Sequence, residues 1–81
     1  MGTLRVMSRR GDDRVQWDTD RLLVGDLEAV AAVREAERIF AEQQAKGATA
    51  FKVTSGQPAV RIDTFDPEAE QITMVPRVTG G

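Results

Sequence analysis

The residues most suited to take part in a reaction lie at the end of the sequence, where Gly81 follows Gly80. At a glycine frequency of about 7%, two such glycines are expected by chance in roughly 0.5% of chains. Glycine has no side chain, so a diglycine end can enter a narrow enzyme channel and present its α-carboxylate to ATP. A carboxylate is ionised at neutral pH and is a poor electrophile, whereas an acyl-adenylate is reactive. The pattern therefore predicts that Gly81 is a substrate for activation.

The rest of the sequence offers few groups for catalysis. It contains no Cys, no His and no Tyr, which excludes a thiolate nucleophile, a Ser–His or Cys–His pair and a zinc–thiolate site. Acidic pairs such as Asp12–Asp13 and Asp63/Asp66 suggest metal ligands, but roles in turns and helix caps explain them better. We therefore expect no enzyme activity of its own, no bound cofactor and no metal site.

Length and charge indicate one small domain without a membrane or nucleic-acid role. The chain has 81 residues and a formal net charge of −2, so it offers no overall attraction to nucleic acid. It lacks an apolar run of about 18 residues that could span a membrane. Its beginning lacks the apolar core of a signal peptide. We expect a cytoplasmic monomer.

An alternation of apolar and polar residues predicts a β-hairpin at the start of the chain. Residues 3–9 alternate, with Leu4 and Val6 on one face, and Val15 and Trp17 continue the alternation after a glycine-containing turn. A period of two is typical of strands. Trp17 is interpreted as a core residue.

A long helix is expected over residues 26–46, after a polar connection at residues 18–25. Asp26 is a good N-cap, and Gly47 is a natural residue to follow the helix end. Apolar residues recur at helical spacing at positions 29, 33, 36 and 40. One apolar stripe and one charged face predict a helix that packs on a single surface.

Three further strands are expected after the helix, at residues 48–54, 60–63 and 72–75. Residues 66–70 read as a helical turn, because an Asp cap precedes a proline and further acids. Pro76 ends the last strand, since it has no N–H to donate. The residues expected to face the helix are Leu4, Val6, Phe51, Val53, Ile72 and Met74. Those expected to face outward are Arg5, Met7, Arg14, Gln16, Lys52, Thr73 and Val75.

The tail and the order of elements resemble a known family. Pro76, Val78, Thr79 and the two glycines look like the carboxyl terminus of sulfur-carrier proteins such as the small subunit of molybdopterin synthase, and the diglycine end also resembles ubiquitin. The resemblance implies an α+β, β-grasp fold: a small mixed sheet of four to five strands with one long helix packed on one face. In that fold the first and last strands are parallel neighbours at the centre of the sheet. Residues 1–75 would form this domain, and residues 76–81 a flexible tail.

The resemblance also implies a function centred on the tail. An E1-like activating enzyme would use ATP to adenylate Gly81, and transfer to a target amine would make the chain a ubiquitin-like protein modifier. Transfer to sulfide would instead give a sulfur carrier with a terminal thiocarboxylate for cofactor or thio-metabolite biosynthesis. A third interpretation is a non-covalent binding domain whose glycines belong to a frayed end. The partners are accordingly the activating enzyme and an acceptor protein or sulfur-transfer partner.

Partner contacts are expected around the tail and its root. Met7 and Val75 would be neighbours if the first and last strands pair, with Arg5, Lys52 and Arg77 around them. The residues predicted to contact a partner are Val78, Thr79 and Gly80 in the enzyme channel, with Pro76, Arg77, Met7 and Val75 at the root. Scattered apolar residues on an ordinary exposed face are the alternative. The polar outer face, and Arg77 where carriers often have a second proline, favour a modifier over a carrier.

Overall fold

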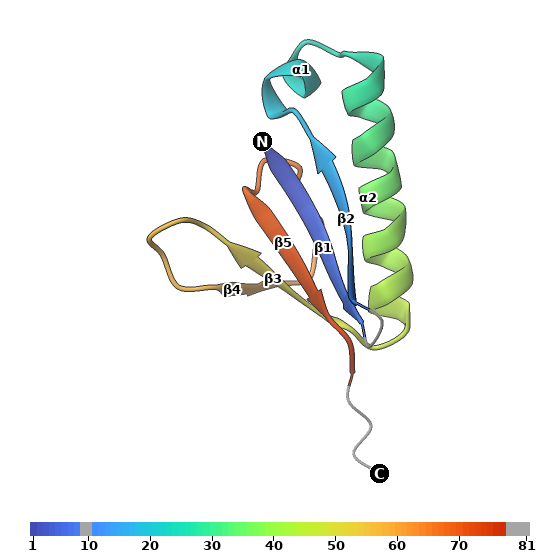
Figure 1. The fold of residues 1–81 in the computed structure, drawn as a ribbon, viewed down its shortest axis with the longest axis vertical. Coiled ribbons are helices and arrows are strands. Elements are labelled where there is room, and N and C mark those ends of the chain that lie inside the picture. The colour runs from blue at the N-terminus through green and yellow to red at the C-terminus, as the bar shows by residue number, and fades with distance from the viewer. Residues whose placement is uncertain (9–10, 78–81) are drawn as a thin grey trace.

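The first and last strands of the chain lie side by side near the centre of one sheet (Figure 1). The computed structural model describes residues 1–8 and 11–77. The strands within these ranges are β1 (Gly2–Ser8), β2 (Gly11–Trp17), β3 (Thr49–Val53), β4 (Val60–Ile62) and β5 (Gln71–Val75). Their order in the sheet is β2-β1-β5-β3-β4. β1 and β5 are parallel, with Leu4 opposite Ile72, and the other neighbours are antiparallel. The predicted parallel pairing is confirmed.

One long helix, α2 (Leu27–Ala45), lies against one face of this sheet (Figure 1). The Asp26 side chain caps it by accepting the backbone N–H groups of Glu28 at 3.0 Å and Ala29 at 3.1 Å. Gly47 follows the end of the helix with φ of 92°, a conformation that favours glycine. The prediction of this helix and of both its ends is confirmed. The described part of the chain is thus a small α+β structure with a mixed five-stranded sheet.

A second, short helix was not expected from the sequence. α1 (Thr19–Leu23) occupies the segment predicted to be a polar connection. Asp18 caps it by accepting the N–H groups of Asp20 at 3.0 Å and Arg21 at 3.2 Å. Helical periodicity cannot be read over five residues, so only this cap and Gly25 mark α1 in the sequence.

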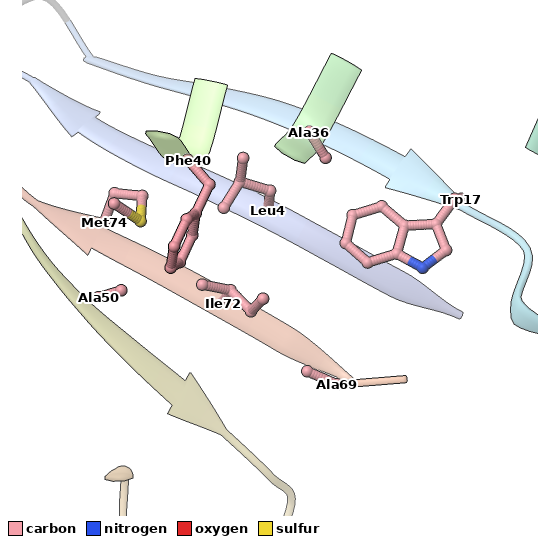
Figure 2. Close-up of a cluster of buried hydrophobic side chains, with 8 residues drawn as sticks. All are labelled: Leu4, Trp17, Ala36, Phe40, Ala50, Ala69, Ile72 and Met74. Atoms are coloured by element: carbon pink, nitrogen blue, oxygen red, sulfur yellow. The ribbon is translucent and has the colours of Figure 1, made fainter. Parts of the chain in front are cut away.

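The core lies between α2 and the two central strands (Figure 2). Leu4, Ile72 and Met74 are fully buried, and Phe40 reaches from α2 toward Ile72 and Met74 (Figure 2). Ala36 contributes almost no volume, which lets the helix approach the sheet closely. The helix stripe predicted from sequence is therefore a core face.

Trp17 anchors the other end of this core. The residue is 2% exposed, and its Nε1–H donates to the carbonyl of Pro67 at 2.9 Å. The ring centroid lies 5.6 Å from that of Phe65, and Phe65 lies 5.8 Å from Phe40. The interpretation of Trp17 as a core residue is confirmed.

The segment before β5 is a hydrogen-bonded turn rather than the expected helical turn. Asp66 Oδ1 accepts the N–H of Glu68 at 3.0 Å, and its carbonyl accepts the N–H of Ala69 at 3.2 Å. Ala69 is 1% exposed and closes the core below β5. The Asp cap was predicted correctly, but the chain enters the strand before a full helical turn forms. Neither described helix has the length and apolar character needed to cross a membrane.

Candidate functional site

The chain leaves the sheet at the end of β5, at the edge of the body where α2 also ends (Figure 1). Val75 is the last residue of the strand and pairs with Thr49 of β3. Pro76 and Arg77 follow without strand structure, and both are exposed. The proline ends the ladder as predicted. Val78, Thr79, Gly80 and Gly81, which carry the predicted chemistry, lie outside the described residues.

Arg77 lies against the loop between α2 and β3. A Cβ atom added to Gly47 would come within 3.1 Å of Arg77 Cδ and 3.5 Å of its Cβ. The arginine stem therefore covers the one position in this loop that has no side chain. This contact places the Arg77 side chain beside the carboxyl end of α2, where the helix dipole favours cations.

Met7 and Val75 lie next to this root. The parallel register pairs Arg5 with Thr73 and Val6 with Met74, so Met7 and Val75 follow at the next position. Their exposed fractions are 43% and 36%. The sequence placed these two residues together through the expected strand pairing, and the register agrees.

The orientation of β3 differs from the prediction. Phe51 and Val53 were expected to face the helix, but Ala50 pairs with the buried Met74, whereas Phe51 pairs with Thr73. Directly opposed residues share a face, so Phe51 and Val53 lie on the outer face of the sheet. Both are half-buried there. On the inner side, Phe40 and Phe65 pack in the core, and the position opposite Met74 is occupied by the buried Ala50.

Lys52 was expected on the outer face and is therefore also misplaced by the prediction. It pairs with Ile72 and lies on the inner side of the sheet. Its Nζ donates to Asp66 Oδ2 at 2.9 Å. This hydrogen bond raises the pKa of Lys52, and the same bond, followed by the Glu68 N–H, lowers the pKa of Asp66. Lys52 thus ties β3 to the turn before β5 and is not part of the rim around Met7.

A row of basic side chains crosses the outer face. The cross-strand register places Arg14, Arg5, Thr73, Phe51 and Arg61 in one line over the five strands. Asp12 accepts hydrogen bonds from Arg5 Nε at 2.6 Å and Arg14 Nε at 3.0 Å. The guanidinium groups of Arg14 and then Arg5 lower the pKa of the Asp12 carboxyl. Exposed ion pairs contribute little stability, so their main effect here is to hold the two arginines in place.

We call this surface the outer sheet face and define it by Arg5, Met7, Asp12, Arg14, Phe51, Val53, Arg61, Thr73 and Val75. It combines apolar side chains with three guanidinium groups and one carboxylate. Sequence reasoning missed Asp12, Phe51, Val53 and Arg61. The missed signal is the pair of alanines at 48 and 50, which alternate with the bulky residues and fit beneath a crowded core.

The arrangement suits recognition more than reaction. Within residues 1–8 and 11–77, no three acidic side chains come together in a way that could hold a metal ion. The expectation of no metal and no enzyme activity remains a prediction. What the described residues do provide is a partly apolar, basic face beside the point where the tail leaves the body. No protein-family model matches the chain, and neither does any curated protein or solved structure.

Proposed function

We propose that this chain is a ubiquitin-like protein modifier with a β-grasp fold. In this proposal a carboxylate oxygen of Gly81 attacks the α-phosphate of ATP on an E1-like activating enzyme, and pyrophosphate leaves. A thiol then attacks the acyl carbon and AMP leaves, after which the amine of a target protein displaces the thiol and an isopeptide bond forms. The proposal requires Gly81 to be the last residue of the mature protein.

One observation carries the proposal. β5, the strand that leads to the tail, lies parallel to β1 at the centre of a mixed sheet. The long helix α2 covers the inner face of this sheet and leaves the outer sheet face open. Pro76 and Arg77 consequently leave the body beside an accessible outer face. An enzyme that binds this face would hold the tail root, Pro76 and Arg77, at a fixed position relative to its adenylation site, as positioning of a reacting group requires.

The outer sheet face is proposed as the surface that the activating enzyme holds. Met7 and Val75 offer apolar area, and the arginines around them offer charge that steers an acidic partner. Because Asp12 fixes Arg5 and Arg14 in advance, less side-chain freedom is lost on binding.

A sulfur carrier is the second candidate, and the orientation of β3 is what favours it. With Phe51 and Val53 on the outer face, this surface is more apolar than the sequence suggested. The polarity expected there was one reason to prefer a modifier. An apolar docking face for a partner that consumes a thiocarboxylate fits these two residues equally well.

Mass spectrometry of the protein from its own cells distinguishes the fates. Trypsin cleaves after Arg77, so a modifier leaves a Val-Thr-Gly-Gly remnant on target lysines. A carrier instead shows the mass increase of oxygen-to-sulfur exchange on the intact chain, without lysine remnants. Cells that produce Gly81→Ala serve as the control and should show neither. If wild-type cells with intact activation machinery also show neither, a non-covalent binding domain becomes the better account.

A further inference from the structure

The junction of α1 and α2 lies at the end of the molecule opposite the tail root (Figure 1), and three large aliphatic side chains at this junction are exposed. The exposed fractions are 76% for Leu23, 81% for Val24 and 84% for Leu27. They lie within five residues of each other, at the junction of α1 and α2. We call them the α1–α2 knob. An exposed group of neighbouring large apolar residues commonly marks an interaction site.

The backbone of the knob is held in one conformation. The N–H of Gly25 donates to the Leu22 carbonyl at 3.1 Å, and that of Asp26 donates to the Arg21 carbonyl at 3.0 Å. These two bonds form a Schellman cap, with Gly25 at φ of 74°. Asp26 then caps α2 directly. Few residues therefore need to be ordered on binding.

The folded chain makes little use of the knob side chains. The hydrophobic contact that often accompanies a Schellman cap would join the residues at Arg21 and Asp26, which are both polar. Leu22, in contrast, packs against the core. The exposed aliphatic residues thus cost solubility without filling the interior.

The rim of the knob is acidic. Asp18, Asp20, Asp26 and Glu28 flank it, and Arg21 is the nearby cation, so this segment carries a formal charge of −3. Arg21 is itself paired with Asp18, Nε to Oδ2 at 3.9 Å. An anionic membrane surface would repel such a rim, and so would a second knob.

We propose that the α1–α2 knob is a second docking site, for a protein partner with an apolar surface bordered by lysine or arginine. The inference does not rest on the chemistry of Gly81. The 19-residue α2 separates the knob from the tail root by about 28 Å at 1.5 Å per residue. A partner bound at the knob therefore leaves the outer sheet face and the tail root accessible.

The probe is a synthetic amphipathic helical peptide of leucine and lysine, titrated into the ¹⁵N-labelled full chain. Its matched comparison has glutamate in place of every lysine. We expect chemical-shift changes centred on Leu23, Val24 and Leu27. We also expect a Kd at least about tenfold lower for the lysine peptide, with the difference shrinking as salt screens the rim.

The variant Leu23→Ser/Leu27→Ser should abolish these shift changes while its melting temperature stays near that of wild type. Val60→Ser is the matched control, because Val60 is an exposed aliphatic residue on β4, away from the knob, with 59% exposure. Equal affinity for both peptides, or no change at the knob, overturns the proposal. It is also overturned if the knob signals depend on protein concentration without peptide, which indicates a second copy, or respond to anionic phospholipid vesicles.

Discussion

The two faces of the sheet differ in composition: buried aliphatic residues dominate the inner face, and charged residues dominate the central row of the outer face. On the inner face, Leu4, Ile72 and Met74 are fully buried beneath Phe40. On the outer sheet face, Phe51 shares its row with three arginines and a threonine. The inner face is tightly packed along β1 and β5, where Leu4, Ile72 and Met74 have no exposed surface, and the outer face has apolar side chains that neither described helix covers. The contrast assigns stability to the inner face, and recognition by the outer sheet face is our proposal.

Two phenylalanines show why size alone does not assign a residue to the core. Phe40 is 3% exposed and is surrounded by core residues from both central strands. Phe51 lies on β3, which pairs with the central strand β5, yet its side chain is on the opposite side of the sheet from Phe40. What decides is the register with β5, because Ala50 and not Phe51 lies opposite Met74.

The comparison predicts its largest effect for these two residues. Phe40→Ala should lower the free energy of unfolding by about 3–5 kcal/mol, because it leaves a cavity in a close-packed core. Phe51→Ala should lower the free energy of unfolding by only about 1 kcal/mol, because neither helix that the structure describes covers the outer face and removal of the ring leaves no enclosed cavity. Urea denaturation of both variants measures the difference. Equal losses would mean that the two faces are equally packed.

Gly2→Ala should cause the next largest loss of stability. A Cβ at Gly2 would run into the indole ring of Trp17, which is itself held by Pro67 and Phe65. Such overpacking costs about 1–3 kcal/mol. In a Trp17→Ala background the same Gly2→Ala change should cost almost nothing, because the clash is removed. A penalty that persists in that background would place its cause elsewhere.

Much of this fold could be predicted from local signals. Asp26 and Gly47 marked both ends of α2, and alternation marked β1 and β2. The orientation of β3 could not, since residues 50–53 offer two alternations and only contacts distant in the sequence choose between them. α1 was missed because a single turn has no period. Of the candidate site, the placement of Met7 and Val75 followed from strand pairing, whereas Arg61 and Phe51 depend on the register of β3.

On the outer face, Met7→Ser should separate recognition from stability. Met7 is 43% exposed, so the free energy of unfolding should change by no more than about 0.5 kcal/mol. If the activating enzyme grips this face, its KM for the chain should rise about tenfold. Val60→Ser, on the other side of the sheet, should leave KM unchanged. A KM unaffected by Met7→Ser would remove the outer sheet face from the proposed interface.

The smallest effect on stability is expected for Asp66→Asn, in the turn before β5. Lys52 lowers the pKa of Asp66, so the charged pair stabilises the fold above the ordinary carboxyl pKa of about 3.9, and this contribution is lost as the pH falls through the folded-state pKa. Asparagine keeps the cap on Glu68 but loses the charge. The variant should melt slightly lower than wild type at pH 7, and the two should converge in acid. A difference that is constant with pH would show that the charge is not its cause.

The central claim is that the folded body binds the activating enzyme and that the Gly81 carboxylate is the group that reacts. ATP–pyrophosphate exchange with the activating enzyme of the source organism tests this claim most directly. Gly81→Ala adds one methyl group at the reacting centre, where a displacement of about 1 Å costs on the order of 100-fold in rate. The account predicts exchange with wild type, a loss of about 100-fold with Gly81→Ala, and the same melting temperature for both. Equal exchange rates for the two proteins, or no exchange of wild type with any activating enzyme of that organism, would contradict it.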